Sequence, residues 1–298
     1  MSSGRGIIYA IAAYGLWGAL PVYWKIMAEI PAREVLAHRM AWSLPFVLLL
    51  LILRRNLRFF LKVIRQWKVL GIYLATATIL TTNWYTYIYA VNSDRIVDAS
   101  LGYFINPLLT VMLGVVFLRE RPRTLQWISF ILALCGVLYL TFVYGSFPWI
   151  GLILAFTFGA YGLIRKTAVL NSLDGLTLES AFMFLPALTY LLVLETNGTG
   201  IFGHTGATVT TALAMTGAIT AIPLILFAAA VRRTKLTTIG LLQYIAPTLQ
   251  FLSGVVLFAE PISRSRLMGF IIIWIALAMF SIEGVFKTRG RFRTPPIP

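Results

Sequence analysis

Apolar runs of about 20 residues recur along almost the whole chain, and this feature constrains its fold more than any other. A helix needs about 20 residues to cross a hydrocarbon core of roughly 30 Å. The sequence predicts ten membrane-spanning helices, at Gly6–Trp24, Val35–Leu53, Trp67–Val91, Ile96–Leu118, Thr124–Val143, Trp149–Ile164, Thr177–Leu194, Val209–Val231, Leu236–Phe258 and Leu267–Phe286. The connections are mostly short and leave no room for a soluble domain. We therefore predict an all-α polytopic membrane protein.

The composition and the N-terminus agree with this interpretation. Hydrophobic residues make up 59% of the chain and charged residues only 12%, whereas a soluble domain carries about 25% charged residues. Arg5 followed by an apolar stretch has the outline of a signal peptide. The stretch continues through Trp17 and Pro21 to Lys25 without a clear small-residue cleavage site, so we expect it to be retained as the first helix.

The basic residues are distributed unevenly between the two ends of the predicted helices. With the N-terminus inside, 19 of the 25 Lys and Arg residues fall on the cytoplasmic side and five on the other, while Arg39 lies within a helix. This bias predicts that both termini are cytoplasmic. Arg165 and Lys166 are expected to follow the same rule. The net charge of +15 is thus attributed to orientation in a bilayer, and no nucleic-acid partner is expected.

An internal repeat appears when the chain is shifted by 140 residues. Leu101–Glu120 and Leu241–Glu260 share eight of twenty positions without a gap, including a proline, a glycine and the final glutamate. This predicts two five-helix repeats, residues 1–145 and 146–286, followed by a basic cytoplasmic tail, residues 287–298. Because five is odd, the second repeat enters the membrane upside down, as in many secondary transporters with a site near the midplane.

Several longer motifs carry a family resemblance that extends from about Gly6 to Phe286. They are AHRMAWS, NWYTYIYAVN, ASLGYFINPL, ERPRTLQW, YGLIRK and GLLQYIAPTLQFL. In these motifs the chain resembles the RarD branch of the EamA-type drug/metabolite transporters. The resemblance implies ten helices in inverted repeats around a central cavity, in a bacterial inner membrane. It also implies an exporter of a small organic metabolite, an amino acid or an amphipathic drug.

Acidic residues are predicted to avoid the middle of the membrane. All ten lie in loops or within a turn or two of a predicted helix end. An intramembrane carboxylate is the usual carrier of protons and sodium. Its absence favours uniport or exchange over a simple carboxylate relay. Glu120 and Glu260 end the two repeat-related stretches and are expected to hold or gate loop ends.

Polar and aromatic residues gather around a proline in each of the two repeat-related helices. A proline inside a helix removes a backbone hydrogen bond and frees a carbonyl, and an uncharged amide is unfavourable in lipid and should face the protein interior. Such residues either bind substrate or join helices by hydrogen bonds; their recurrence in both repeats favours binding. The predicted substrate-binding set is Trp17, Asn83, Trp84, Tyr103, Asn106, Pro107, Tyr161, Gln243, Tyr244, Pro247 and Gln250.

A second group is predicted at the outer mouth, where His38 and Arg39 lie near the start of the second helix. Arg39 can extend to lipid headgroups, pair with Glu34 or Glu29, or meet a substrate carboxylate. We favour a structural role for Arg39.

The alternatives to a transporter are a membrane-embedded enzyme and a channel. The two histidines, His38 and His204, are far apart in sequence and there is no central acid, which disfavours an enzyme. The chain has no P-loop motif, and its single Cys135 excludes an intramolecular disulfide and any Cys/His metal spacing. Inverted repeats with kinked central helices favour alternating access over an open pore. We therefore expect a secondary transporter with a small-molecule substrate, no cofactor and no metal.

Overall fold

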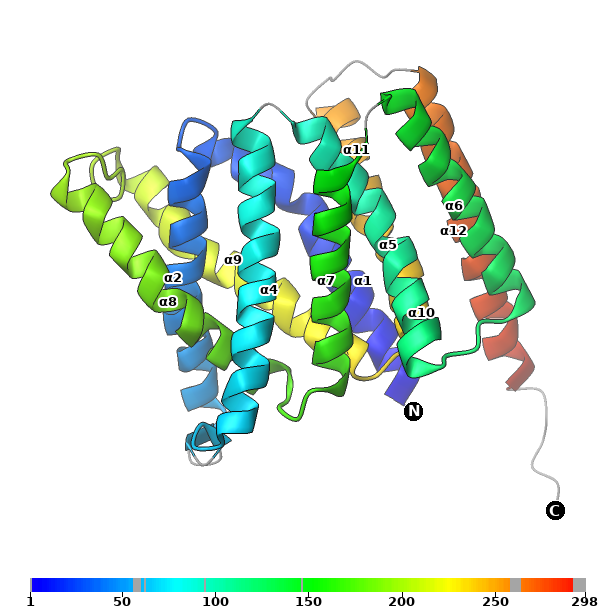
Figure 1. Ribbon diagram of the computed structural model, residues 1–298, viewed down its shortest axis with the longest axis horizontal. Helices are drawn as coiled ribbons and strands as arrows, with labels where there is room; N and C mark the ends of the chain where they lie inside the picture. The colour runs from blue at the N-terminus through cyan, green and yellow to red at the C-terminus, as the bar shows by residue number, and fades with distance from the viewer. Residues whose placement is uncertain are drawn as a thin grey trace.

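The computed structural model is a bundle of long helices (Figure 1). It describes residues 2–55, 60–61, 63–93, 95–145, 147–257 and 264–291. The helices are α1 (Ser2–Trp24), η1 (Lys25–Met27), α2 (Ala32–Leu53), α4 (Trp67–Asn92), α5 (Ile96–Leu118), α6 (Thr124–Tyr144), α7 (Trp149–Thr167), α8 (Ser172–Thr196), α9 (Ala207–Val231), α10 (Leu236–Leu242), α11 (Ile245–Leu257) and α12 (Arg264–Arg291). The described part of the chain contains no strand.

Eight segments of the described chain are long and apolar enough to cross a membrane, and α12 contributes a shorter apolar stretch, Leu267–Phe280. The prediction of an all-α polytopic membrane protein is confirmed at this level. Helix α4 is long enough as well, but it is not among the eight. Its second half, TTNWYTYIYAVN, is rich in threonine, asparagine, tyrosine and tryptophan. This part of α4 faces the cavity described below.

The helix predicted over Leu236–Phe258 is divided into α10 and α11, with a break at Gln243 and Tyr244. The cause lies in Pro247, which has no N–H to donate to the carbonyl of Gln243. That carbonyl accepts from the N–H of Ala246 instead, over 3.3 Å. Pro107 occupies the related position in α5, but there the helix continues without a break. The predicted ninth span is therefore present as one crossing, Leu236–Leu257, but its helix is interrupted at Gln243 and Tyr244.

Helices α1 and α9 run obliquely across the bundle, behind α2, α4 and α7, and α6 and α12 form a pair at one edge (Figure 1). Helix α5 packs on α7 and α10, α1 packs on α9 and α11, and α2 packs on α8 and α9. Helix α1 begins and α12 ends at the same end of the bundle, where the turns after α5, α7 and α9 also lie (Figure 1). The turns after α5 and α9 and the last turn of α7 carry basic residues, so we call this the basic end.

Glycines allow two of these helix pairs to approach closely. A side chain at Gly217 of α9 would lie 2.2 Å from the backbone of Trp42 in α2. A side chain at Gly240 of α10 would lie 2.6 Å from the carbonyl oxygen of Pro107 in α5. Small residues at such crossings let helix backbones meet, which is the usual basis of helix association in membranes.

Two helix boundaries differ from the prediction in ways that matter for charged residues. Helix α8 begins at Ser172 and not at Thr177, which makes Glu179 its eighth residue. Helix α12 continues to Arg291, so the first part of the predicted tail at 287–298 is helical. Residues 292–298 and Glu260 lie outside the described residues.

Candidate functional site

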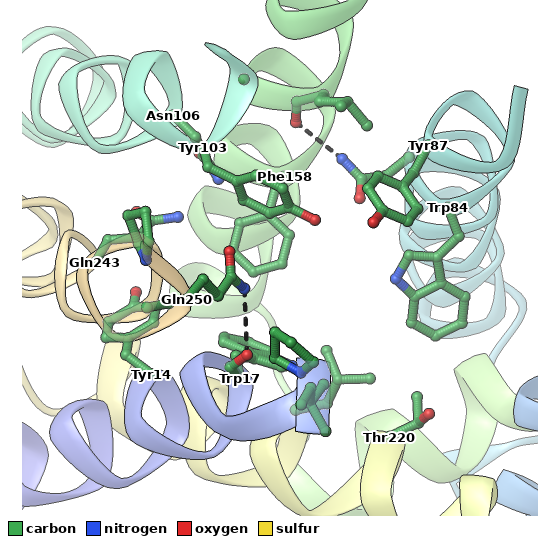
Figure 2. A pocket seen from close by; sticks show the side chains of 18 of the residues that line it. Tyr14, Trp17, Trp84, Tyr87, Tyr103, Asn106, Phe158, Thr220, Gln243 and Gln250 are labelled. Carbon is green, nitrogen blue, oxygen red and sulfur yellow. Dashed lines mark hydrogen bonds between the residues drawn. The ribbon is translucent and has the colours of Figure 1, made fainter. Parts of the chain in front are cut away.

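A cavity of about 240 Å³ lies between the helices (Figure 2). Its wall comes from α1, α2, α4, α5, α7 and α9 and from the region of the α10–α11 break. The lining residues are Tyr14, Trp17, Leu20, Pro21, Trp24, Arg39, Asn83, Trp84, Tyr87, Gly102, Tyr103, Asn106, Leu154, Phe158, Thr220, Leu224, Gln243, Ala246, Pro247 and Gln250. This mixture of aromatic walls and a few polar groups is typical of a small-molecule pocket.

The cavity extends from the middle of the bundle toward the end opposite the basic end. Helix α1 begins at the basic end (Figure 1), and its lining residues fall in its second half, from Tyr14 to Trp24. Helix α5 ends at the basic end, and its lining residues, from Gly102 to Asn106, fall in its first half. The site is therefore displaced from the centre toward the other end of the bundle.

Aromatic rings form much of the wall. The ring centroid of Trp17 lies 5.7 Å from that of Tyr14 and 5.6 Å from that of Phe158. Across the cavity, Tyr87 and Tyr103 meet edge to face at 6.3 Å (Figure 2). Such separations are typical of favourable ring contacts, so the wall is held in shape without a ligand.

Two of the predicted amides join helices to one another. Asn83 of α4 donates to the carbonyl of Leu154 and to the hydroxyl of Thr157 in α7, both over 2.8 Å. Gln250 of α11 donates to the carbonyl of Trp17 in α1 over 3.2 Å (Figure 2). Both residues also line the cavity. They thus join helices by hydrogen bonds and also face the cavity.

The amide of Gln243 is in a different situation. It lies at the α10–α11 break with only 6% of its surface exposed, and its Oε1 has no hydrogen-bond partner. The Tyr14 hydroxyl is also buried without a partner, and the two side chains lie on the same side of the cavity in Figure 2. Asn106, by comparison, accepts from Thr110 over 3.3 Å. A buried carbonyl without a donor is costly, and a bound solute could supply the donor.

Three residues of the predicted binding set do not line the cavity. Pro107 is buried against α10. The Tyr244 hydroxyl donates to the carbonyl of Phe104 over 3.1 Å, within the packing of α5 and α12. The Tyr161 hydroxyl donates to Oε2 of Glu179 over 3.1 Å. The hydroxyls of Tyr244 and Tyr161 are thus used in contacts outside the cavity.

The two residues predicted at the outer mouth are placed differently from one another. His38 is buried; its ring stacks on Phe202 with centroids 5.1 Å apart and accepts a hydrogen bond from the indole of Trp42. It does not line the cavity. Arg39 does line it. The favoured structural role for Arg39 was an extension to headgroups or a pair with Glu34 or Glu29, and the described structure contains neither pair.

Helical spacing could have identified several lining residues that the sequence reasoning missed. Tyr14, Pro21 and Trp24 lie on the same face of α1 as Trp17, at intervals of three or four residues. Tyr87 follows Trp84 by three residues in α4. A search for aromatic residues at this spacing around the predicted ones would have found them.

A fully buried ionic cluster was also missed. The Arg165 Nε atom lies 3.8 Å from Oε1 of Glu179, and both side chains are 0% exposed. Arg165 also donates to the carbonyl of Ser172 over 2.8 Å and lies over the ring of Tyr73. A side chain at Gly175 would overlap the guanidinium. Arg165 was predicted only to follow the bias of basic residues toward the cytoplasmic side, but it is buried inside the protein. Glu179 was predicted near a helix end, and it is buried as well.

The basic end is closed by a second charged group. Both carboxylate oxygens of Glu120 accept backbone N–H groups at the start of α10, from Leu236 over 2.7 Å and from Thr237 over 2.8 Å. Lys166 lies 3.8 Å from the same carboxylate and donates to the carbonyl of Val231 at the end of α9. An anion at a helix start and a cation at a helix end are both favourable. These contacts tie α5, α7, α9 and α10 together.

Long apolar helices around a partly polar cavity define a class of protein, the polytopic membrane transporters. In the described residues no group of three or more His, Cys, Asp or Glu side chains could hold a metal. The EamA-like transporter family matches residues 4–142. Together with the relatives given below, which cover nearly the whole chain, this match shows that the chain is a membrane transporter of the drug/metabolite family and not an enzyme.

Proteins of similar sequence place the chain more narrowly among the membrane transporters. Protein RarD of Streptomyces exfoliatus is 42% identical, over 95% of this chain and 90% of its own length. The uncharacterized transporter YojE of Bacillus subtilis is 40% identical, over 94% of this chain and 95% of its own length. This chain belongs to the RarD branch of the EamA-type transporters. A solved crystal structure with 16% identity superimposes with a TM-score of 0.70, covering 93% of this chain and 96% of that one, and this likeness concerns the fold alone.

Proposed function

We propose that this chain is a secondary transporter that exports a small organic solute across the bacterial inner membrane by alternating access. The solute is a metabolite, an amino acid or an amphipathic drug, and it occupies the 240 Å³ cavity. The observation that carries the proposal is this cavity, with the partnerless Oε1 of Gln243 at its wall. A solute with a hydrogen-bond donor would satisfy that carbonyl.

The packing of the helices supports two inverted repeats at 1–145 and 146–286, with ten crossings. The main packing pairs are converted into one another when each helix is exchanged for its counterpart in the other repeat. The counterparts are α1 and α7, α2 and α8, α4 and α9, α5 and α10–α11, and α6 and α12. The α5–α7 pair becomes α1–α10/α11, and α2–α9 becomes α4–α8, while α2–α8, α5–α10 and α6–α12 become themselves. A two-fold relation of this kind is the basis of alternating access, since either repeat can open in turn.

The basic end is assigned to the cytoplasm, which makes both termini cytoplasmic. With this orientation the cavity extends from the middle of the bundle toward the outer side, and the contacts of Glu120 and Lys166 close the inner side. A closed inner side argues against a permanently open pore. During transport, α5 and α10 would separate at this side while the outer side closes.

A matched pair of neighbouring residues tests the site. Gln243→Ala removes a polar group from the cavity wall, whereas Tyr244→Phe removes a hydroxyl that only bonds to a backbone carbonyl outside it. One lost hydrogen bond is worth about 0.5–1.5 kcal/mol. We therefore expect Gln243→Ala to lower transport up to about tenfold with normal membrane yield, and Tyr244→Phe to lower thermal stability first.

The measurement compares metabolites in the medium of cells that overproduce the wild-type protein or either variant. At least one solute should accumulate with the wild type and with Tyr244→Phe, and less with Gln243→Ala. If the medium does not change with the wild type, export is refuted. If Gln243→Ala exports as well as the wild type, the cavity is not the transport site.

A further inference from the structure

Among the described residues that line the cavity, Arg39 is the one that carries a charge. Its Cζ atom lies 5.1 Å from the ring centroid of Trp24 and 4.8 Å from that of Trp84, and its Nε–H donates to the hydroxyl of Thr220 over 3.1 Å. In the described residues, no carboxylate pairs with it. A guanidinium inside a membrane protein without a counter-ion marks a functional site.

Most of the guanidinium's hydrogen-bonding capacity is available. Arginine has five N–H donors in a planar fork, and the contact with Thr220 uses one of them. The two tryptophan rings stabilise the positive charge through their faces, but a ring face does not replace an oxygen acceptor. A carboxylate matches the fork with two parallel hydrogen bonds.

The opposite side of the cavity has a different chemistry. In Figure 2, Gln243 and Tyr14 lie on one side, and Trp84 and Thr220, which contact Arg39, lie on the other. Trp17 and Phe158 lie between them. The cavity thus has a cation at one side, an apolar middle, and at the other side the amide of Gln243, whose Oε1 is buried without a hydrogen-bond partner.

From this arrangement we infer that the transported solute is an organic monocarboxylate with a flat apolar body and an uncharged hydrogen-bond donor at its far end. The lining carries a positive charge, and it includes no carboxylate from the described residues to receive an ammonium group. In a site of low dielectric, an unpaired ammonium is strongly unfavourable. A monoanion is therefore preferred over a zwitterion, an amine or a neutral amide of the same shape. The inference rests on the proposed transport function.

Four probes share a para-hydroxyphenyl ring and differ in the charged group of a short side chain: para-hydroxyphenylacetate is an anion, its amide is neutral, tyramine is a cation and tyrosine is a zwitterion. Binding of each is measured on the full-length protein in nanodiscs, for the wild type, Arg39→Gln and Arg39→Lys. Arg33→Gln is the control, because Arg33 lies on the same helix but on the exposed surface. The melting temperature of each variant is recorded alongside.

We expect the wild type and Arg33→Gln to bind the carboxylate at least about tenfold more tightly than the other three probes, since a hydrogen bond to a charged group contributes that much or more. Arg39→Gln should weaken carboxylate binding about 10- to 100-fold and leave amide binding within about twofold. Arg39→Lys, which keeps the charge but not the fork, should lie between them. The preference of the wild-type protein for the carboxylate is measured without any variant, so it tests the inference even if Arg39→Gln folds poorly.

The inference is overturned if the amide, tyramine or tyrosine binds as tightly as the carboxylate, if none of the four binds, or if a well-folded Arg39→Gln retains the preference. The proposed transport function is tested separately by the medium of overproducing cells. Accumulation there of only cationic or neutral solutes would refute the anion preference while leaving export standing. An unchanged medium would refute export itself.

Discussion

Replacing Glu179 by glutamine tests whether the buried ionic cluster stabilises the bundle. The substitution keeps the shape of the side chain and removes its charge. The Arg165 guanidinium would then remain fully buried, with its Nε and Nη1 atoms lacking hydrogen-bond partners and only Nη2 bonded, to the carbonyl of Ser172. Breaking a buried pair in this way costs about 3–5 kcal/mol, because one uncompensated charge is left behind.

The expected value lies near the lower limit of that range. The ring of Tyr73, 5.4 Å from the Arg165 Cζ atom, continues to stabilise the cation, and such a contact is worth about 2 kcal/mol when desolvated. The amide of the variant can still accept from the Tyr161 hydroxyl. We therefore expect a loss of about 3 kcal/mol. At about 2–4 °C per kcal/mol, this lowers the melting temperature by roughly 6–12 °C.

The matched control is Glu195→Gln. Glu195 pairs with His204 at 3.0 Å, but both side chains are more than half exposed, and an exposed pair contributes about 1 kcal/mol or less. Melting is followed by fluorescence-detected gel filtration of detergent-solubilised protein after heating. A further variant, Arg165→Met combined with Glu179→Gln, should recover most of the loss, because no charge is left unpaired. Equal, small shifts for Glu179→Gln and Glu195→Gln would refute the reasoning.

Three further outcomes are expected. Gly240→Val should lower the free energy of unfolding by about 1–3 kcal/mol, because a Cβ there would lie 2.6 Å from the carbonyl oxygen of Pro107. Gly71→Ala should not lower it, because Gly71 has open space around it. Equal melting temperatures of the two variants would contradict this packing. Glu120→Gln should speed hydrogen–deuterium exchange in the first turn of α10, since the N–H groups there lose a charged acceptor. Unchanged exchange would show that the contact of Glu120 does not hold the basic end closed. Alkaline phosphatase fused after Ser146 should be active and at Arg123 inactive, and the reverse would overturn the orientation.

The all-helical fold could be predicted because it depends on signals that are local in the sequence. A bilayer requires about 20 apolar residues for each crossing, and nearly every predicted segment agrees with a helix in the structure. The break between α10 and α11 was harder to predict. Pro107 and Pro247 have the same local effect, yet only the second interrupts its helix. The difference depends on the neighbouring helices, which a single sequence does not give.

The candidate site was predictable in part for the same reason. Residues such as Trp84, Asn106 and Gln243 combine a polar or aromatic side chain with a central position, and both properties can be read locally. Tyr161 has both properties too, but it faces Glu179 because α8 begins five residues earlier than expected. A shift of this size moved one carboxylate from a predicted helix end into the protein interior.

Arg39 and Arg165 show why the role of a buried charge cannot be assigned from sequence alone. Both arginines lie in helices within a few turns of one end, and both were expected to serve orientation or anchoring. In the structure, Arg165 has a carboxylate 3.8 Å away and no access to the cavity. Arg39 faces the cavity, and its neighbours in the described residues are two tryptophans and a threonine. A paired charge stabilises the bundle, whereas free donors that face a cavity are the feature from which we infer solute recognition at Arg39.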